Sequence, residues 1–303
     1  MSGARPVLAA IEAGGTKCVV AMGYGHDAPQ LIARVPTTDP AHTFAEISAV
    51  LAQGVAQFGR LAGLGVAAFG PLQLDTAAAN FARVLATPKS GWAGADWRSL
   101  LAQHPGCAFA IDTDVNAAAL AEHRWGAAMG CDVSAYVTVG TGIGGGVVVR
   151  GRSLRGLLHP ELGHLRLRRH PQDVSFHGVC PFHGDCLEGV ASGPAITARC
   201  GTNLSALDDS HPLIDVVADS LAQLCAHLLL VLSTQCIVLG GGVLGDARLL
   251  PRIRRSCGQY LNGYLGPSAD TARLETLIRA PGLAEYSGLA GAFLLADQAL
   301  DRG

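Results

Sequence analysis

Thiols and imidazoles gather in one short stretch of the chain with a spacing typical of metal ligands. Cys180, His183 and Cys186 form a C-x2-H-x2-C run, and His164 lies upstream of it. Two thiolates and two imidazoles can complete a tetrahedron, and this donor set favours zinc. Because four protein ligands leave no position open for water, we predict a structural zinc site. His177 is a fifth candidate ligand, although its neighbours suggest a turn.

Three glycine-rich turns have the composition of phosphate-binding loops. They occupy Gly14–Lys17, Gly140–Gly146 and Gly240–Gly242, and each follows a short apolar run. A glycine-rich hairpin presents backbone N–H groups to a phosphate with no Cβ in the way. A tight β-turn without a ligand is the alternative for either of the first two loops alone, but together with the third turn they favour a triphosphate site. Hydroxyl donors would come from Thr16, Thr138 and Thr141.

A dinucleotide-binding protein is a further alternative, because Gly140–Gly145 and Gly240–Gly245 both match G-x-G-x-x-G. That fingerprint requires a preceding strand and a following helix. The first match is followed by Val147–Val149, which is β-branched and strand-like. The second has no clear acidic ribose partner about 20 residues further on. Neither loop is a Walker A motif, since Gly14–Lys17 lacks the preceding glycine spacing. We therefore favour a different kind of nucleotide site.

The composition sets the broad class of the protein. The 303 residues are 49% hydrophobic and 15% charged, which provides a large core and excludes disorder. A net charge of −2 argues against a broad nucleic-acid surface. No signal peptide is expected, and the apolar run Leu228–Leu232 is too short for a membrane span, so we predict a buried helix there. The nine cysteines are expected to be reduced in the cytoplasm, which disfavours a Cys180–Cys186 disulfide.

A strand, a glycine loop and a second strand occur together twice, which predicts a duplicated α/β architecture. The first pair is Val7–Glu12 with Cys18–Tyr24, and the second is Ala135–Val139 with Val147–Arg150. The segment from His159 to Gly193 has little periodicity, and such segments tend to be functional or cross-linked. The remaining apolar patterns predict strands at Leu64–Phe69, Ala108–Asp112 and Cys236–Leu239, and helices at Thr43–Phe58, Asn116–Trp125, Leu213–Leu232, Arg248–Tyr264 and Gly288–Leu300.

The ordered set of motifs resembles the ROK family of sugar kinases across essentially the whole chain. EAGGTK at Glu12–Lys17, Thr87–Trp92 and the loop Cys180–Glu188 look most like the zinc-containing bacterial fructokinases. The other motifs that carry the resemblance are Asp112–Asn116, Gly140–Gly146, Glu161–His164, Cys186–Gly189 and Ile237–Gly242.

The resemblance implies an α/β, two-lobed actin-like ATPase fold (hexokinase/ribonuclease H-like) with duplicated lobes and an interlobe cleft. A small N-terminal lobe would cover residues 1–115 and be joined by the C-terminal helix 288–303. A large lobe would cover 116–287 and carry the zinc loop 159–193. The implied activity is that of an ATP-dependent hexose kinase that phosphorylates the sugar 6-hydroxyl, with fructose as the first candidate. ATP, a small sugar and a second copy in a homodimer are the expected partners, with no nucleic acid and no membrane.

The resemblance also assigns roles to individual residues. Asp114 is the implied catalytic base; helix N-capping is its alternative role, and Asp112 is the nearest rival. Magnesium, bound with ATP, is expected near Glu12. The implied sugar ligands are Asn116, Glu161, His164, Glu188, Lys89, Gly70 and Pro71. The implied ATP-binding residues are Gly14, Gly15, Thr16, Lys17, Thr138, Gly140, Thr141, Gly142, Gly144, Gly193, Pro194, Gly240, Gly241 and Gly242.

The chain departs from the family pattern at three places. Glu12 replaces the usual aspartate but keeps a carboxylate, and Cys180 with His183 replaces a Cys-x-Cys pair but keeps zinc ligands. Thr113 stands where many members have asparagine, which bears on sugar selectivity. A kinase for glucose, mannose or an N-acetylhexosamine is therefore an alternative. A non-catalytic sugar sensor or repressor is another, but the phosphate loop at Gly14 leaves no room for an N-terminal helix-turn-helix domain.

Overall fold

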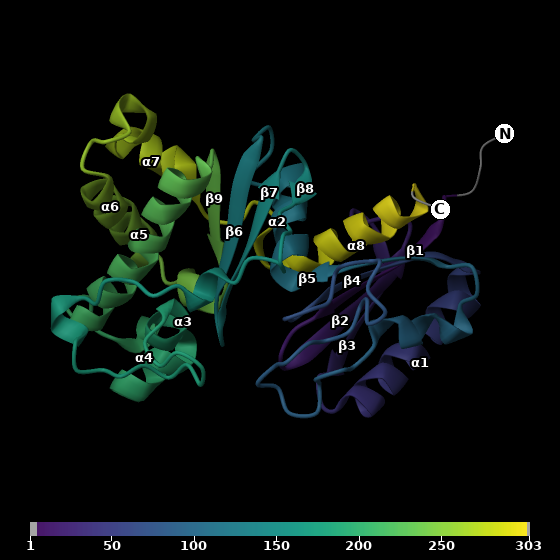
Figure 1. The fold of residues 1–303 in the computed structure, drawn as a ribbon. Coiled ribbons are helices and arrows are strands. Elements are labelled where there is room, and N and C mark those ends of the chain that lie inside the picture. The colour runs from purple at the N-terminus through teal and green to yellow at the C-terminus, as the bar shows by residue number, and fades with distance from the viewer. Residues whose placement is uncertain (1–4, 302–303) are drawn as a thin grey trace. The chain divides into compact units, whose positions relative to one another are not determined.

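The computed structural model describes residues 5–301, and its packing divides the chain into two units (Figure 1). Unit 1 comprises the chain up to Ala121, Arg155–His159 and the segment from Tyr286 onward. Unit 2 comprises Glu122–Leu154 and Pro160–Glu285. The division thus falls a few residues after the expected boundary at residue 115, and a short internal segment joins unit 1. The expected small lobe also includes residues 1–4 and 302–303, which lie outside the described residues.

Each unit is built on a five-stranded sheet, and the two sheets share one topology, which confirms the predicted duplication. In each sheet three antiparallel strands are followed by two strands that run parallel to the first. The order is β3-β2-β1-β4-β5 in unit 1 and β8-β7-β6-β9-β10 in unit 2. The strands are β1 (Val7–Ala13), β2 (Lys17–Gly23), β3 (Pro29–Pro36), β4 (Leu61–Ala68), β5 (Ala108–Thr113), β6 (Val133–Val139), β7 (Ile143–Val149), β8 (Arg152–Ser153), β9 (Cys236–Gly240) and β10 (Ile278–Arg279).

Helices cover the sheet of unit 1. Helix α8 (Ser287–Leu300) packs on β1, β4 and β5, while α1 (Pro40–Phe58) packs on β2 and β3 (Figure 1). A Cβ on Gly65 of β4 would lie 1.9 Å from the backbone oxygen of Ala292, so only glycine allows α8 to approach this closely. Helix α1 begins earlier than its apolar pattern indicates, because Asp39 caps its first turn and Pro40 suits its first position.

The core of unit 2 lies between its sheet and two long helices, α5 (Pro212–Leu232) and α6 (Leu249–Leu261). Among the described helices, α5 alone is long and apolar enough to cross a membrane, but 72% of its most apolar window is buried inside the unit. It is therefore the buried helix that the sequence predicted. Shorter helices complete the unit: α3 (Leu187–Ala191), α4 (Gly193–Cys200) and α7 (Thr271–Leu277). Helix α2 (Asp114–Trp125) begins in unit 1 and ends in unit 2.

Candidate active site

The edge of the unit 1 sheet where β1, β4 and β5 end brings several of the expected residues together. These strands are parallel, so their carboxyl ends share an edge, and Glu12, Ala67 and Asp112 are in register across them. The turn Gly14–Lys17 follows β1, Gly70 and Pro71 follow β4, and Asp114 follows β5. Ligand sites in open α/β sheets lie at such edges. This edge therefore holds an acidic residue, a phosphate-type turn and the expected base.

Asp114 is the first residue of α2, and its side chain is not the helix cap. The hydroxyl of Thr113 accepts the backbone N–H of Asn116 at 3.1 Å, so Thr113 caps α2. The Asp114 carboxylate accepts the N–H of Val115 at 2.9 Å. Burial raises the pKa of Asp114 to about 6, and the Val115 N–H opposes that shift. A carboxyl group with this pKa can accept a proton near neutral pH.

Asp112, the rival base, is occupied by structural contacts. Its carboxylate is fully buried and accepts Arg155 Nη2 at 2.6 Å, Asn116 Nδ2 at 2.7 Å and the N–H of Thr113 at 2.8 Å. Arg155 lies in a segment far along the chain, and no motif pointed to it. The Asn116 amide oxygen is buried and has no hydrogen-bond partner among the described residues. That oxygen is therefore the atom of Asn116 that could accept a ligand hydroxyl.

Glu12 has the environment of a carboxylate that would accept a cation. Burial raises its pKa to about 7, the charge of Asp114 adds to the shift, and Lys17 opposes it. The side chain reaches the start of α8, where a Cβ on Gly288 would lie 2.2 Å from Glu12 Oε1. Two carboxyl groups that hinder each other's ionisation fit a divalent cation, whose charge offsets both. The residues present therefore fit the expected magnesium near Glu12.

The β1–β2 turn is held by hydrogen bonds to its carbonyl groups, while most of its residues are exposed to solvent. The N–H of Gly14 donates to the carbonyl of Lys17 at 3.0 Å, and the Thr37 hydroxyl donates to the carbonyl of Gly14 at 2.9 Å. The Lys89 ammonium donates to the carbonyl of Gly15. Gly15, Thr16 and Lys17 are exposed. Lys89 thus lies against the phosphate-type turn, while its expected role toward the sugar stays a prediction.

The other expected ATP-binding residues gather at the equivalent edge of unit 2. Thr138 at the end of β6 is in register with Gly240 at the end of β9, and with Gly144 in β7. The N–H of Gly193, the first residue of α4, donates to the carbonyl of Gly140 at 2.8 Å. Gly241 has φ of 93°, and a Cβ there would lie 2.5 Å from the Val139 carbonyl oxygen, so this turn requires glycine. The same edge carries Thr141, Gly142, Pro194 and Gly242.

Two of the expected sugar ligands share a short turn, and a third lies beside the β6–β7 turn. The N–H of His164 donates to the carbonyl of Glu161 at 3.1 Å, within the predicted helical turn. Glu188 Oε2 accepts the N–H of Ile143 at 3.0 Å. A Cβ on Gly142 would lie 2.7 Å from the same oxygen, so glycine makes room for Glu188. Glu188 is therefore placed next to the glycine turn of unit 2.

The four predicted zinc ligands form one cluster in unit 2. One donor atom from each lies within 4.8 Å of the others. The His164 Nδ1 atom is 3.8 Å from Cys180 Sγ and 3.6 Å from Cys186 Sγ, and His183 Nδ1 is 3.7 Å from Cys180 Sγ. Tetrahedral zinc bonds place sulfur and nitrogen ligands about 3.5 Å apart, so the donors fit zinc. His177 is not part of the cluster.

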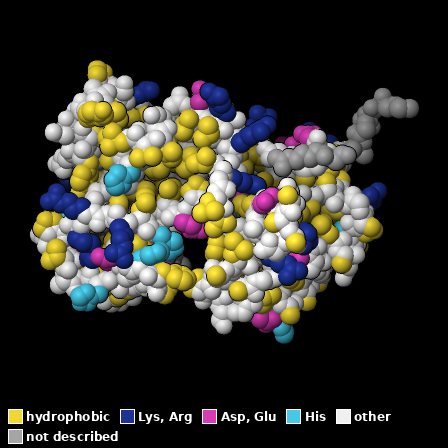
Figure 2. Space-filling model, in the orientation of Figure 1, with side chains coloured by type: hydrophobic (Ala, Val, Ile, Leu, Met, Phe, Trp, Pro, Cys, Tyr) yellow, Lys and Arg dark blue, Asp and Glu magenta, His cyan; other side chains and the backbone are white. Residues whose placement is uncertain are grey.

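The loop around this cluster has little apolar packing of its own. Between the ligands Cys180 and Cys186 the apolar side chain of Phe182 is 64% exposed, and Val179 just before them is 39% exposed. Arg169 and Arg166 approach Asp185 at 3.6 and 3.9 Å. Figure 2 shows histidine side chains gathered on this part of unit 2, with arginine and acidic side chains beside them. A metal ion would therefore supply order that the side chains of the loop do not.

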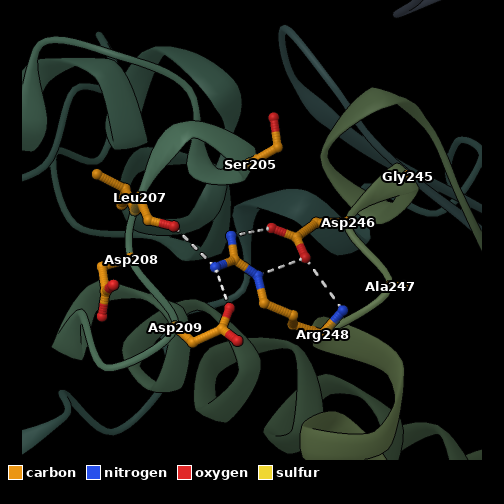
Figure 3. Close-up of a pocket in the computed structure, with 8 residues that line it drawn as sticks. All are labelled: Ser205, Leu207, Asp208, Asp209, Gly245, Asp246, Ala247 and Arg248. Atoms are coloured by element: carbon orange, nitrogen blue, oxygen red, sulfur yellow. Dashed lines mark hydrogen bonds and ion pairs between the residues drawn. The ribbon is translucent and has the colours of Figure 1, made fainter.

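A further pocket of unit 2, which no motif indicated, has a volume of about 560 Å³ (Figure 3). Arg248 spans it, donating to Asp246 at 2.6 Å, to Asp209 at 2.8 Å and to two backbone carbonyls. The pocket begins at Gly245, just after the glycine turn Gly240–Gly242. Arg248 connects that region to the loop before α5 through these hydrogen bonds, so we interpret Arg248 as a structural residue.

Comparison with known proteins gives one consistent result. Residues 8–299 match the family model described as the ROK family. A fructokinase of Zymomonas mobilis is 39% identical over 98% of this chain and 98% of its own length. A putative fructokinase of Bacillus subtilis is also 39% identical, over 97% of this chain and 96% of its own length.

Solved structures agree on the fold. A ROK hexokinase from Thermus thermophilus has a TM-score of 0.77 and 27% identity, covering 98% of this chain and all of its own. A ROK family glucokinase from Streptomyces griseus, in complex with glucose and AMPPNP, has a TM-score of 0.71 and 24% identity, covering 96% and 99% of the two chains. Together with the duplicated sheets, these matches confirm the predicted α/β actin-like ATPase fold.

Proposed function

The chain belongs to the ROK family, and we propose that it transfers the γ-phosphoryl group of ATP to the 6-hydroxyl of fructose. Fructokinase relatives match nearly the full length of the chain, which supports an ATP-dependent sugar kinase. The observation that carries the proposal is Asp114, which follows β5 at the carboxyl edge of the unit 1 sheet. Thr113, and not Asp114, caps helix α2, and burial raises the pKa of Asp114 to about 6.

Phosphoryl transfer depends mainly on positioning and charge neutralisation, with a base for the hydroxyl proton. In the proposed reaction Asp114 accepts the proton of the sugar hydroxyl while that oxygen attacks the γ-phosphorus in line. Backbone N–H groups of the turns Gly14–Lys17 and Gly140–Gly142 bind the phosphates. Magnesium, when bound with ATP, supplies positive charge to the phosphate oxygens. Glu12 orients that cation from the end of β1.

The sugar is proposed to be bound by hydrogen bonds to its hydroxyl groups. Glu161 and Glu188 are carboxylates that can accept from sugar hydroxyls, and Asn116 offers its unpartnered amide oxygen. His164 directs Nδ1 to the metal cluster, which leaves Nε2 to meet the sugar. Gly70 and Pro71 complete the proposed set at the end of β4. Side chains of these types suit a polyol substrate.

We further propose that His164, Cys180, His183 and Cys186 hold one structural Zn²⁺. The support is the fit of the donor distances to a tetrahedron and the sparse apolar packing of the loop. Zinc bound there would fix the ring of His164 and the loop that leads into Glu188. A homodimer is proposed as the assembly, and its mass is measurable by light scattering.

Kinases for glucose, mannose or N-acetylhexosamines remain competing proposals within the family. The fructokinase relatives favour fructose, because they are 34–39% identical over nearly their full length. Bifunctional NanE/NanK enzymes are 29% identical over about half their own length. The ROK transcriptional regulator among the similar structures is 19% identical and shows the fold alone.

The test is initial-rate ADP release from Mg-ATP with fructose, glucose, mannose and N-acetylmannosamine, and the product is located by NMR. We expect fructose to give the highest kcat/KM and fructose 6-phosphate as the product. No turnover with any hexose contradicts the kinase assignment. A preference for an N-acetylhexosamine, or a phosphate on the 1-hydroxyl, contradicts the fructokinase proposal.

A further inference from the structure

Both lysines of the chain lie at the same turn, although arginine supplies every other basic side chain. Lys17 is the last residue of the β1–β2 turn. Lys89 comes from a loop far along the chain, and its ammonium donates to the carbonyl of Gly15 and, at 3.4 Å, to the carbonyl of Thr37. One lysine therefore belongs to the turn expected to bind phosphate, and the ammonium of the other contacts that turn.

The loop that carries Lys89 is held in place independently of the turn. The Trp92 side chain is fully buried, and its indole N–H donates to the carbonyl of Thr38 at 2.7 Å. The N–H of Trp92 donates to the carbonyl of Lys89 at 3.2 Å, and the N–H of Lys89 donates to the hydroxyl of Thr87 at 3.3 Å. Lys89 Nζ also lies 5.8 Å from the centre of the Phe69 ring. Its position is thus set before any ligand arrives.

The ammonium group of Lys89 has three N–H donors. Two of them are accounted for by the carbonyl of Gly15 and the carbonyl of Thr37. Lys89 thereby holds the Gly15 carbonyl of a glycine-rich turn, which is a type of loop that can present backbone N–H groups to a phosphate. A compact ammonium suits this place better than the planar fork of arginine, which needs more room to approach one carbonyl.

We propose that Lys89 is a positioning residue for the nucleotide: it fixes the β1–β2 turn and gives its third N–H to the terminal phosphate of ATP. Lys89 then serves phosphate binding and not sugar binding, which differs from the role that the resemblance implies. This inference rests on the proposed kinase function. It adds a cation to the phosphate site beyond Lys17 and the magnesium near Glu12.

Arg60 provides a matched control within the same unit. It also donates to two backbone carbonyls of a loop, those of Pro105 and Gly106, at 3.3 and 3.5 Å. However, it precedes β4 and so lies at the amino end of a strand whose carboxyl end forms the site. Arg60→Met removes a cation and its carbonyl contacts without touching the β1–β2 turn.

The kinetic experiment compares Lys89→Met, Lys89→Arg and Arg60→Met with the wild-type enzyme. A hydrogen bond to a charged group contributes about 1.5–3 kcal/mol, so Lys89→Met should raise KM for ATP about tenfold or more. KM for fructose should stay within about twofold, Lys89→Arg should recover part of the ATP affinity, and Arg60→Met should match the wild type. A change in KM for fructose with KM for ATP unchanged overturns the proposal, and so does wild-type behaviour of Lys89→Met.

A second experiment needs no turnover. Because the chain has two lysines, pyridoxal 5′-phosphate with borohydride followed by peptide mass spectrometry reports each one separately. We expect magnesium with AMPPNP to protect Lys89 from labelling, while fructose alone leaves it reactive. Protection by fructose alone, or none by the nucleotide, overturns the inference. Failure of the kinase proposal would be visible separately, as absence of ADP release by the wild type.

Discussion

The two β-hairpin turns at equivalent places in the two sheets differ in charge. The pair Ala13 and Cys18 closes the first turn around Gly14–Lys17, and the pair Val139 and Ile143 closes the second around Gly140–Gly142. The first turn is one residue longer than the second. It includes Lys17, and its Gly15 carbonyl accepts a hydrogen bond from Lys89. The second contains only glycine and threonine, and its carbonyl at Gly140 receives the N–H of Gly193 at the start of α4.

The ends of the equivalent parallel strands differ in the same way. Strand β5 leads directly into Asp114, whereas its counterpart β10 leads into Ala280 and Pro281. Glu12, near the end of β1, has Thr138 at the equivalent place in β6. The shared topology therefore provides two similar edges, and the carboxylates of Glu12 and Asp114 lie at the edge of the unit 1 sheet. At the edge of the unit 2 sheet the turn has glycine and threonine, and Glu188 accepts a hydrogen bond from Ile143 there. The cluster of His164, Cys180, His183 and Cys186 also lies in unit 2.

The largest effect should come from removing the proposed base, Asp114, at the edge of the unit 1 sheet. Asp114→Asn should lower kcat about 10²–10⁴-fold, because the amide cannot accept the hydroxyl proton. Fructose and ATP should still bind, and the circular dichroism spectrum should stay that of the wild type. Turnover near the wild-type rate would show that Asp114 is not the base.

The ion pair beneath that edge should be the next most sensitive feature. Arg155→Met removes the guanidinium that pairs with the fully buried Asp112, and loss of one partner of a buried pair typically costs about 3–5 kcal/mol of unfolding free energy. Arg98→Met is the matched control, because its ion pair with Asp96 is exposed to solvent and its loss should lower the unfolding free energy much less. Urea unfolding of both variants measures the difference. Equal losses would show that Asp112 does not depend on Arg155.

Loss of the metal should affect the second edge selectively. Cys186→Ser should lose stoichiometric zinc and raise KM for fructose about 10–100-fold, because the loop before Glu188 and the ring of His164 lose their anchor. KM for ATP should change less. Cys200→Ser is the control, since that thiol lies outside the cluster and donates only to backbone carbonyls. The molar ratio of zinc to protein is measured by inductively coupled plasma mass spectrometry. A wild-type protein without zinc, or unchanged fructose affinity in Cys186→Ser, contradicts the assignment.

The raised pKa of Asp114 predicts how stability depends on pH. Its folded pKa is about 6 and its unfolded pKa about 3.8, so the wild type loses stability as pH rises from about 4 to 6. Asp114→Asn should therefore be more stable than the wild type by up to about 3 kcal/mol at pH 7, and equally stable below about pH 4. Thermal or urea unfolding across this range checks the sign. An asparagine variant that is less stable at pH 7 would contradict the buried, strained carboxylate.

The smallest effect on activity should come from a substitution that displaces the Glu12 carboxylate but keeps its charge. A Cβ on Gly288 would collide with the flexible end of the Glu12 side chain, so Gly288→Ala should displace the carboxylate at little cost in stability. We expect the magnesium concentration needed for half-maximal rate to rise about threefold to tenfold, with KM for fructose unchanged. Glu12→Gln is the comparison, because it removes the charge in place. Identical magnesium titrations for Gly288→Ala and wild type would show that Glu12 does not hold the cation.

Much of this arrangement could be predicted from the sequence, because its signals are local. Apolar runs ending in glycine turns marked β1 and β6, and the Cys/His spacing marked the cluster. Strand β3 was not predicted, since its alternating pattern is weak at the edge of a sheet. The pairs Arg155–Asp112 and Lys89–Gly15 were also missed, because they join residues far apart in the chain. Such contacts depend on tertiary packing, and no spacing rule encodes them.

The difference between the two edges can be tested most directly by measuring kcat and KM for Asp114→Asn and Cys186→Ser side by side, with fructose and Mg-ATP taken to saturation. The difference between the two edges predicts that saturating fructose restores Cys186→Ser to within about threefold of the wild-type kcat, while Asp114→Asn stays at least about 100-fold lower. It would be contradicted by a Cys186→Ser enzyme with normal KM and a lost kcat, or by an Asp114→Asn enzyme that fructose restores.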